Sequence, residues 1–122
     1  MSLTLDPGSD PLTLASVRTL ILSFPGMEEG TSYGTPGFRT GGKLLVRMHQ
    51  DGEALVVRVD PSERETLMEG DPVTFYITDH YRNHPWVLVC LSTVSPAELR
   101  DLIEKAWRKA APKRLVAAFD AR

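Results

Sequence analysis

Residues 43–60 read Lys43-Leu-Leu-Val-Arg-Met-His-Gln-Asp-Gly-Glu-Ala-Leu-Val-Val-Arg-Val-Asp60, and they predict an antiparallel hairpin. Asp51-Gly52 favours a two-residue type I′ turn, because that turn requires positive φ at both central positions. The flanking segments are rich in aliphatic and β-branched residues, which strands prefer. Two strands joined at residues 51–52 are therefore expected.

The turn also predicts the pairing register. With Asp51-Gly52 as the loop, one face of the hairpin carries only apolar pairs, namely Met48 with Leu55, Val46 with Val57 and Leu44 with Val59. The other face is mixed and pairs His49 with Ala54, Arg47 with Val56, Leu45 with Arg58 and Lys43 with Asp60. A slip of one residue would turn the two arginines into the core, which favours this register.

Helices and further strands surround the hairpin. Periodic apolar residues predict a helix over 13–24, with Asp10 or Thr13 as N-cap, and one over 96–110. Asp60-Pro-Ser-Glu63 and Ser95-Pro-Ala-Glu98 have the pattern of capping boxes, the first opening a short helix to about residue 69. Strands are expected at 31–33, 37–40, 73–78 and 86–93, and a last helical turn or two at 113–119. Together they predict an α+β fold, in which helices pack on one face of an antiparallel sheet.

Length and composition limit the class of protein. The 122 residues suit one domain over 12–122, preceded by a mobile tail at 1–11. The net charge of −2 argues against general, charge-driven nucleic-acid binding. No signal peptide or membrane span is expected, and Cys90 as the single cysteine is consistent with the cytoplasm.

Catalytic and metal-binding patterns are weak. There is no nucleophile elbow, P-loop or His-Glu-x-x-His motif, so the sequence predicts neither an enzyme nor a cofactor. His80 and His84 with Asp79 lie in a segment whose Pro85 disfavours a helix, and their spacing matches no closed zinc ligand set. Cys90 lies in an apolar strand, which favours a packing role over a catalytic one.

The mixed face of the hairpin is the first candidate site. It combines basic and apolar residues, a composition suited to an anionic ligand, a nucleic acid or a partner protein. The alternative is that a helix or a second subunit covers the apolar members while the arginines extend to solvent. The candidate contacts on the sheet are Arg39, Lys43, Arg47 and Arg58.

The C-terminal helix is a second source of cations. Residues 105–122 carry Lys105, Arg108, Lys109, Lys113, Arg114 and Arg122 against Asp120 alone. Cations also favour the C-terminal end of a helix for electrostatic reasons, so this run has a purely structural explanation. Lys105, Arg108 and Lys109 are nevertheless included among the candidate anion contacts.

The polar and aromatic segment between two strands is the third candidate. Side chains on such a loop can reach a phosphate or a base, or can pack over the end of the core. The candidate ligand contacts are His80, Tyr81, Arg82, His84 and Trp86.

Several short motifs together resemble the MmcQ/YjbR family of small bacterial proteins. They are Phe24-Pro-Gly26, Tyr33-Gly-Thr-Pro-Gly-Phe-Arg39, Gly42-Lys-Leu-Leu45, Asp60-Pro61, Phe75-Tyr-Ile-Thr-Asp-His-Tyr81 and Trp86-Val-Leu-Val89. The resemblance covers residues 12–120 and implies a CyaY/frataxin-like α-β-α domain. The family is commonly described as DNA-binding. Frataxins bind iron through an acidic first helix, whereas residues 13–24 contain no Asp or Glu, so iron binding is not expected.

Three hypotheses for function follow. The first is a module that binds DNA or another polyanion through the basic sheet face. The second is a protein-interaction or homodimerising module without catalytic activity. The third is binding of a small ligand or metal at the loop 80–86.

Overall fold

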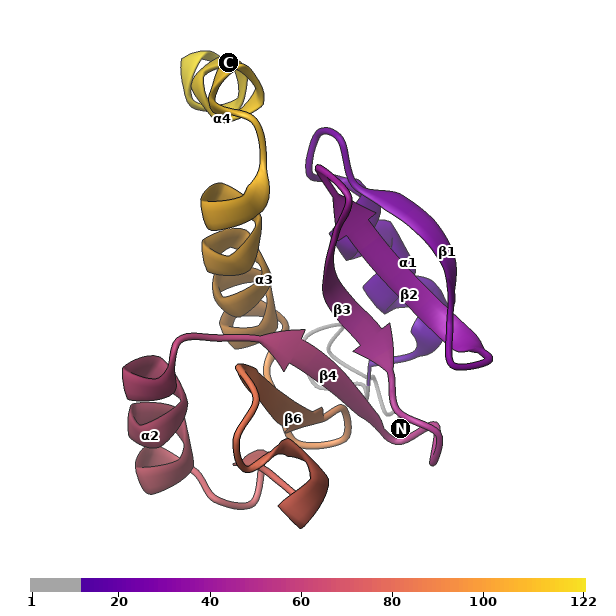
Figure 1. Ribbon diagram of the computed structural model, residues 1–122, viewed down its shortest axis with the longest axis vertical. Coiled ribbons are helices and arrows are strands. Elements are labelled where there is room, and N and C mark those ends of the chain that lie inside the picture. Colours follow the sequence, from indigo (N-terminus) through magenta and orange to yellow (C-terminus); the bar gives the residue numbers. More distant parts are fainter. Residues whose placement is uncertain (1–11) are drawn as a thin grey trace, which may run out of the picture.

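A six-stranded antiparallel sheet forms the centre of the molecule, with strand order β1-β2-β3-β4-β6-β5 (Figure 1). The computed structural model describes residues 12–122, and the tail expected at residues 1–11 lies outside them. The strands are β1 (Glu28–Ser32), β2 (Thr35–Thr40), β3 (Lys43–Met48), β4 (Ala54–Arg58), β5 (Phe75–Tyr76) and β6 (Trp86–Cys90). The expected strand at 73–78 is thus reduced to two residues.

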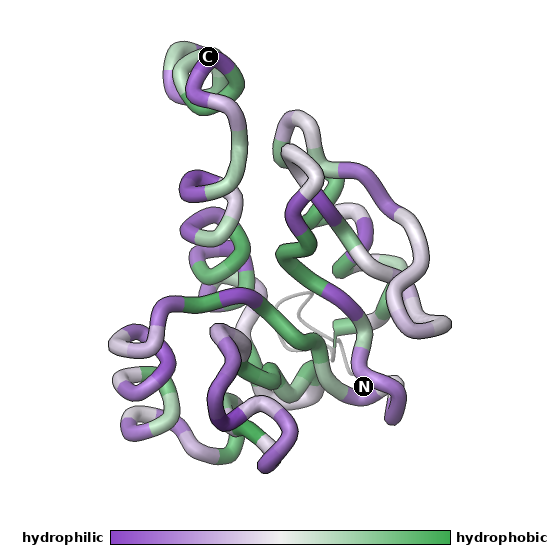
Figure 2. Tube along the Cα trace, in the orientation of Figure 1, coloured by the Kyte–Doolittle hydropathy of each residue, from purple (hydrophilic) through white to green (hydrophobic). Residues whose placement is uncertain are grey.

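Helices pack against one face of this sheet, which confirms the predicted α+β class. They are α1 (Leu14–Leu22), α2 (Pro61–Gly70), α3 (Pro96–Ala110) and α4 (Lys113–Ala121), and a short 3-10 turn, η2 (Asp79–Tyr81), precedes β6. Hydrophobic residues run along β3 and β4 in the middle of the molecule, whereas α2 is mostly hydrophilic (Figure 2). Accordingly, α2 has no fully buried residue and lies at the margin of the core.

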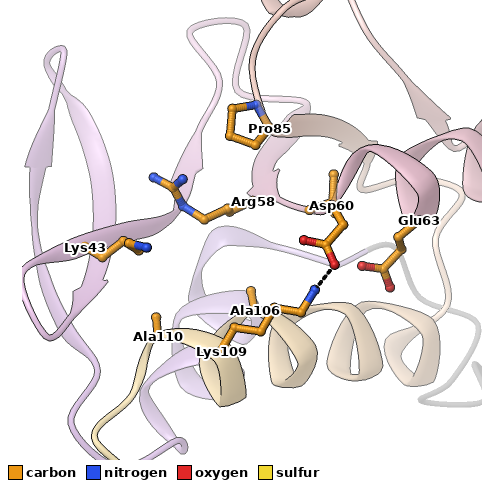
Figure 3. A pocket seen from close by; sticks show the side chains of 9 residues that line it. Lys43, Arg58, Asp60, Glu63, Pro85, Ala106, Lys109 and Ala110 are labelled. Carbon is orange, nitrogen blue, oxygen red and sulfur yellow. Dashed lines mark hydrogen bonds and ion pairs between the residues drawn. The ribbon is translucent and has the colours of Figure 1, made fainter.

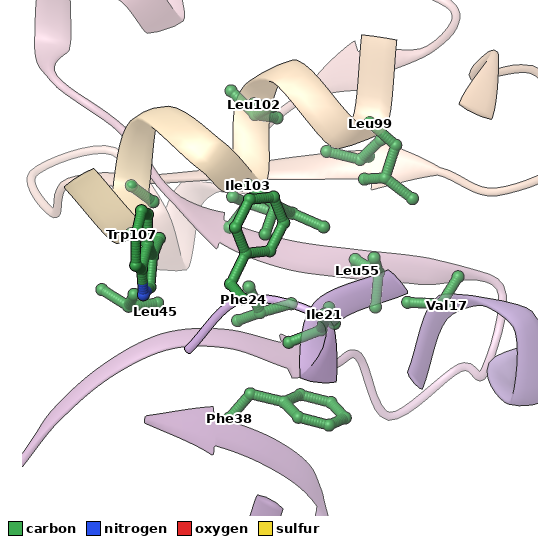
Figure 4. Close-up of a cluster of buried hydrophobic side chains, with 14 of the residues drawn as sticks. Val17, Ile21, Phe24, Phe38, Leu45, Leu55, Leu99, Leu102, Ile103 and Trp107 are labelled. Atoms are coloured by element: carbon green, nitrogen blue, oxygen red, sulfur yellow. The ribbon is translucent and has the colours of Figure 1, made fainter. Parts of the chain in front are cut away.

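The core lies between the sheet and helices α1 and α3 (Figure 4). Val17 and Ile21 from α1 and Ile103 and Trp107 from α3 have no exposed surface. These residues recur at the spacing of one helical face, which is why the helices present them to the sheet together. Phe24, just after α1, packs its ring against Trp107 with centroids 5.5 Å apart.

The predicted hairpin register is confirmed over residues 46–48 and 55–57. Val46 pairs with Val57, Arg47 with Val56 and Met48 with Leu55. The His49 amide donates to the Ala54 carbonyl at 2.9 Å, closing the ladder beside the turn. The predicted type I′ turn is wrong, because Gly52 has φ 73° but Asp51 does not have a positive φ, and the Gly52 amide donates instead to the His49 carbonyl at 3.0 Å. The Asp51 carboxylate accepts from the Glu53 amide at 2.8 Å, so its side chain also stabilises the turn.

The start of β3 differs from the prediction. Phe38 lies opposite Val46 but Arg39 lies opposite Leu44, so Leu45 is an extra residue in β3. Such a bulge changes which face the preceding residues point to. Leu45 is fully buried in the core, whereas Leu44 is half-buried on the opposite face. The prediction that Leu44 faces the core and Leu45 the mixed face is therefore wrong.

One of the two predicted capping boxes forms. The Ser95 hydroxyl accepts from the Glu98 amide, and the Glu98 carboxylate accepts from the Ser95 amide, both at 3.1 Å. Thr13, one of the two candidates, is the N-cap of α1. Asp60 occupies the N-cap position of α2 but makes no side-chain cap, because its carboxylate accepts from Lys109 of α3 instead. The capping box predicted at residues 60–63 is therefore wrong.

Substituting Gly26 with alanine is expected to lower the free energy of unfolding by about 1–3 kcal/mol. Gly26 has φ +79°, and an added Cβ would lie 2.7 Å from Leu115 Cδ1 of α4. Gly42 is a matched control, because its φ is +78° but an added Cβ would meet nothing within 4 Å. Urea unfolding should show a larger loss for Gly26→Ala than for Gly42→Ala. Equal losses would show that contact with α4 contributes nothing at this position.

Candidate functional site

The second face of the sheet, opposite α1 and α3, is partly covered by the loop between β5 and β6. Tyr81 in η2 is 5% exposed and packs with Ala54, Val56 and Leu88. The apolar residues of this face are therefore covered by the chain's own loop rather than by a helix. Packing of Tyr81 fixes where the neighbouring polar side chains of the loop lie.

Arg64 of α2 holds this loop in place. Its Nη1 donates to the carbonyls of Tyr81, His84 and Trp86 at 3.0, 2.7 and 3.1 Å, and its Nη2 donates to that of Arg82 at 2.9 Å. The planar guanidinium has several donors in a rigid arrangement, which suits a set of converging carbonyls. Arg64 was not among the residues predicted from the sequence, because an arginine on a polar helix is usually solvent-exposed and no local pattern distinguishes this one.

Arg47 lies under the loop and is 6% exposed. It donates to the Met48 carbonyl at 3.3 Å and to the Tyr81 hydroxyl. Its guanidinium carbon lies 5.4 Å from the ring centre of Tyr33 and 5.9 Å from that of Tyr81. Within residues 12–122, no carboxylate lies within ion-pair distance of it. A buried charge without a counter-charge is costly, which makes Arg47 a candidate for pairing with an anion from outside the chain.

These elements enclose a cavity of about 270 Å³ on the second face, here called the second-face recess. It is lined by Tyr33, Leu44, Arg47, His80, Tyr81, His84 and Trp86. The recess joins Arg47 of the sheet group with four members of the loop group, which the sequence had presented as separate candidates. Arg82, the fifth member, lies outside the lining and pairs with Asp79.

Tyr33 is a lining residue that the sequence did not identify as part of a site. It is 83% exposed and has φ 54° in the turn between β1 and β2. A large side chain at positive φ is uncommon and worth a functional explanation. The neighbouring Gly34, an exposed glycine in the same turn, was the only signal that this tyrosine would project from a tight turn.

Trp86 lines the recess, and Arg58 stacks on its ring from outside the lining. The Arg58 guanidinium carbon lies 4.5 Å from the Trp86 ring centre, and its Nε donates to the Leu44 carbonyl at 2.9 Å. Burial lowers the pKa of Arg58, although an arginine remains protonated at neutral pH. The stacked pair fixes the position of the tryptophan ring.

The remaining candidate cations do not join the recess. On α3, Lys105 pairs with Glu63 at 3.1 Å, Arg108 with Glu104 at 2.8 Å and Asp120 at 2.7 Å, and Lys109 with Asp60. The Arg108 guanidinium lowers the pKa of the Asp120 carboxyl. Arg39 makes one long contact to the Thr31 carbonyl at 3.5 Å, and Lys43 is exposed. The seven candidates are thus divided between the two sides of the sheet.

Metal ligands do not converge in the part of the chain that the structure describes. No group of three or more His, Cys, Asp or Glu side chains lies close enough together to hold an ion. The rings of His80 and His84 are 6.2 Å apart between centres. None of the helices between residues 12 and 122 has the length and apolar character needed to cross a membrane.

Comparison with known proteins identifies relatives of this chain. A family model described as YjbR matches residues 22–109. Uncharacterised proteins of Mycobacterium tuberculosis and Mycobacterium bovis are 38% identical over 69 residues, which is 56% of this chain and 54% of theirs. The chain therefore spans about half the length of the curated relatives it matches.

A solved structure shares the fold. The crystal structure of Deinococcus radiodurans protein DR2400, described with the family-model domain DUF419, superposes with a TM-score of 0.69 at 24% sequence identity. The match covers 81% of this chain and 79% of that protein. At this identity the likeness concerns the fold alone.

Proposed function

This chain belongs to the YjbR family, and we propose that it is a binding module for single-stranded nucleic acid that holds an unpaired nucleotide in the second-face recess. The observation that carries the proposal is Arg47, an arginine 6% exposed that lines the recess and has no carboxylate partner among residues 12–122. A phosphate at the recess would supply the missing counter-charge. The proposed role is binding, without a chemical step or a cofactor.

The aromatic lining supports a base as the second part of the ligand. Tyr33 presents its ring to solvent, and Trp86 is half-buried with Arg58 stacked on it. Proteins that bind single strands combine such rings with cations, because every base has a face that can stack. The cavity of about 270 Å³ lies just below the usual size of drug-binding pockets, about 300–1,000 Å³, and so suits one ring system.

The charge distribution favours a single strand over a duplex. Duplex binding draws most of its affinity from many phosphate contacts along an extended cationic surface. Here Lys105, Arg108 and Lys109 are paired with carboxylates, and they lie on α3, on the other side of the sheet from the recess. One strand with an unstacked base needs only a short path past Arg47, Arg58 and the aromatic rings.

A self-associating module is the alternative function. It is favoured by the exposed ring of Tyr33 and by β1, whose one partner strand within residues 12–122 is β2. Sedimentation of the protein alone separates this function from strand binding. A concentration-dependent dimer that Tyr33→Ala abolishes, with no affinity for nucleic acid, would favour the alternative.

Binding of a labelled single strand should be detectable by fluorescence anisotropy and weaken when the salt concentration rises. Tyr33→Ala is expected to weaken it by about tenfold, because stacking on one ring contributes about 1–3 kcal/mol per base. Trp107 is fully buried, so quenching of tryptophan fluorescence on binding would report Trp86. Val73→Ala, at a side chain that is 69% exposed outside the recess, is the matched control.

Two results would contradict the proposal. Equal affinity for a duplex of the same sequence would show that no unpaired base is needed. Unchanged affinity of Tyr33→Ala would remove the recess from the binding site, even if the strand bound elsewhere.

A further inference from the structure

A second pocket lies at one end of the two central strands, where the start of β3 and the end of β4 approach α3 (Figure 3). Its volume is about 200 Å³, and we call it the edge pocket. Arg58 contributes to its lining and stacks on Trp86 of the second-face recess, so this pair separates the two cavities. The edge pocket is therefore a distinct site with a lining of its own.

One side of the edge pocket is cationic and has unused donors. Lys43 and Arg58 have no carboxylate within ion-pair distance anywhere in residues 12–122. Arg58 commits its Nε to the Leu44 carbonyl, and its two Nη groups make no hydrogen bond to a described residue. A carboxylate bound here could pair with both side chains, and an arginine fork suits that geometry.

Two carboxylates, Asp60 and Glu63, lie on the opposite side, with Lys109 beside Asp60 (Figure 3). Asp60 accepts from Lys109 through Oδ2, and Glu63 pairs with Lys105 through Oε2. The other oxygen of each carboxylate has no hydrogen-bond donor in the described part of the chain. Because a carboxylate can accept several hydrogen bonds, both side chains could also receive an ammonium group without losing their lysines.

The surface between the two charged sides is apolar. Ala106 and Ala110 of α3 contribute methyl groups, and Val59 and Pro85 line the same cavity. No polar side chain other than the five charged ones lines the pocket. A ligand in this cavity can therefore contact cationic side chains, carboxylates and a small hydrophobic patch.

We propose that the edge pocket binds a free aliphatic α-amino acid. Its carboxylate pairs with Lys43 and Arg58, its ammonium group pairs with Asp60 and Glu63, and its side chain lies on Ala106 and Ala110. A simple anion would face two carboxylates, and a simple amine would face Lys43, Arg58 and Lys109, so each alone meets like charge. A zwitterion satisfies both sides, and the small volume limits the side chain to a few carbons.

L-valine tests the proposal against two analogues that each lack one charge, isovalerate without the amine and isobutylamine without the carboxylate. In a titration followed by ¹H–¹⁵N NMR, L-valine is expected to shift the backbone amides of residues 58–60, 62, 63 and 106–110. Its affinity should exceed that of either analogue by at least tenfold. The second-face recess does not take part, so this result is independent of nucleic-acid binding.

Two variants test which charged side chains contribute to valine binding. Lys43→Gln and Asp60→Asn should each weaken valine binding at least tenfold, whereas Lys113→Gln on α4 should leave it unchanged. Lys43 is exposed and Asp60 makes no helix cap, so neither change is expected to unfold the protein. Isovalerate binding as tightly as valine would overturn the proposal in favour of a simple anion site. Absence of valine-induced shifts at millimolar concentration, or equal affinity in Lys43→Gln, would overturn it outright.

Discussion

Replacing Trp107 with alanine is expected to lower the free energy of unfolding by about 3–5 kcal/mol. Trp107 has no exposed surface, and its ring lies 5.5 Å from that of Phe24 and 4.9 Å from that of Phe119. It thereby joins the end of α1, helix α3 and helix α4. A loss of this size is a large part of the about 5–15 kcal/mol by which domains are stable. Urea unfolding followed by circular dichroism measures it.

Trp107→Phe separates packing from hydrogen bonding. The indole Nε1 donates to the Pro25 carbonyl at 2.8 Å, and phenylalanine keeps an aromatic ring but leaves that carbonyl without its donor. We expect a loss of about 1–3 kcal/mol for this variant. A loss below about 1 kcal/mol for Trp107→Ala would contradict the packing of α1, α3 and α4 around this ring.

Replacing Arg64 with alanine is expected to release the loop that covers the second sheet face. The side chain donates to four carbonyls between residues 81 and 86, and none of those bonds can form in the variant. Hydrogen bonds to a charged group contribute about 1.5–3 kcal/mol, so we expect a loss of about 2–3 kcal/mol in stability. Strand binding at the recess should weaken by more than tenfold, because Tyr81, His84 and Trp86 lose their fixed positions.

Two further variants control for charge and for loop position. Arg82→Ala removes an arginine from the same loop, but one whose side chain forms an exposed ion pair with Asp79, so it should have little effect. Arg64→Lys keeps the charge without the planar fork and should lie between the wild type and Arg64→Ala. Amide hydrogen exchange over residues 77–86 reports loop release directly. Unchanged exchange and unchanged strand affinity in Arg64→Ala would contradict the role assigned to Arg64.

The hairpin shows what local patterns can predict. Asp51-Gly52 and the alternation on either side determine the pairing of Met48 with Leu55 and Val46 with Val57, since a slip would bury arginines. The Ser95 capping box is local in the same way, because both of its hydrogen bonds join residues three apart. Such features depend on neighbours in the sequence and were predicted correctly.

The bulge in β3 shows where local patterns fail. Leu44, Leu45 and Val46 are all apolar, so their sequence has no alternation that could mark the extra residue. The shift between Phe38 and Arg39 becomes visible only once β2 is paired with β3. The capping box predicted at Asp60 is wrong for a related reason, because the lysine that binds this carboxylate lies 49 residues further along the chain.

The candidate site has features that local patterns predict and others that they miss. The sequence identified Arg47 and the loop 80–86 by residue type, but as two separate candidates. Their union in one recess depends on Tyr81, 34 residues from Arg47, and on Arg64, which holds the loop from another helix. Tyr33 joined them only because β1 and β2 place their turn beside β3. Long-range contacts of this kind leave no periodic trace in the sequence.

By itself, then, the sequence determined the fold class, the family resemblance, the hairpin register and the residue types available for binding. These follow from turn chemistry, side-chain periodicity and composition, which act over a few residues. The tertiary structure alone decided that Arg47 is buried without a counter-charge among residues 12–122 and that the helix lysines are paired. It also decided that Arg58, which lines the edge pocket, stacks on Trp86, which lines the recess. Burial and ion pairing depend on which distant segments meet, and only packing of the whole chain determines that.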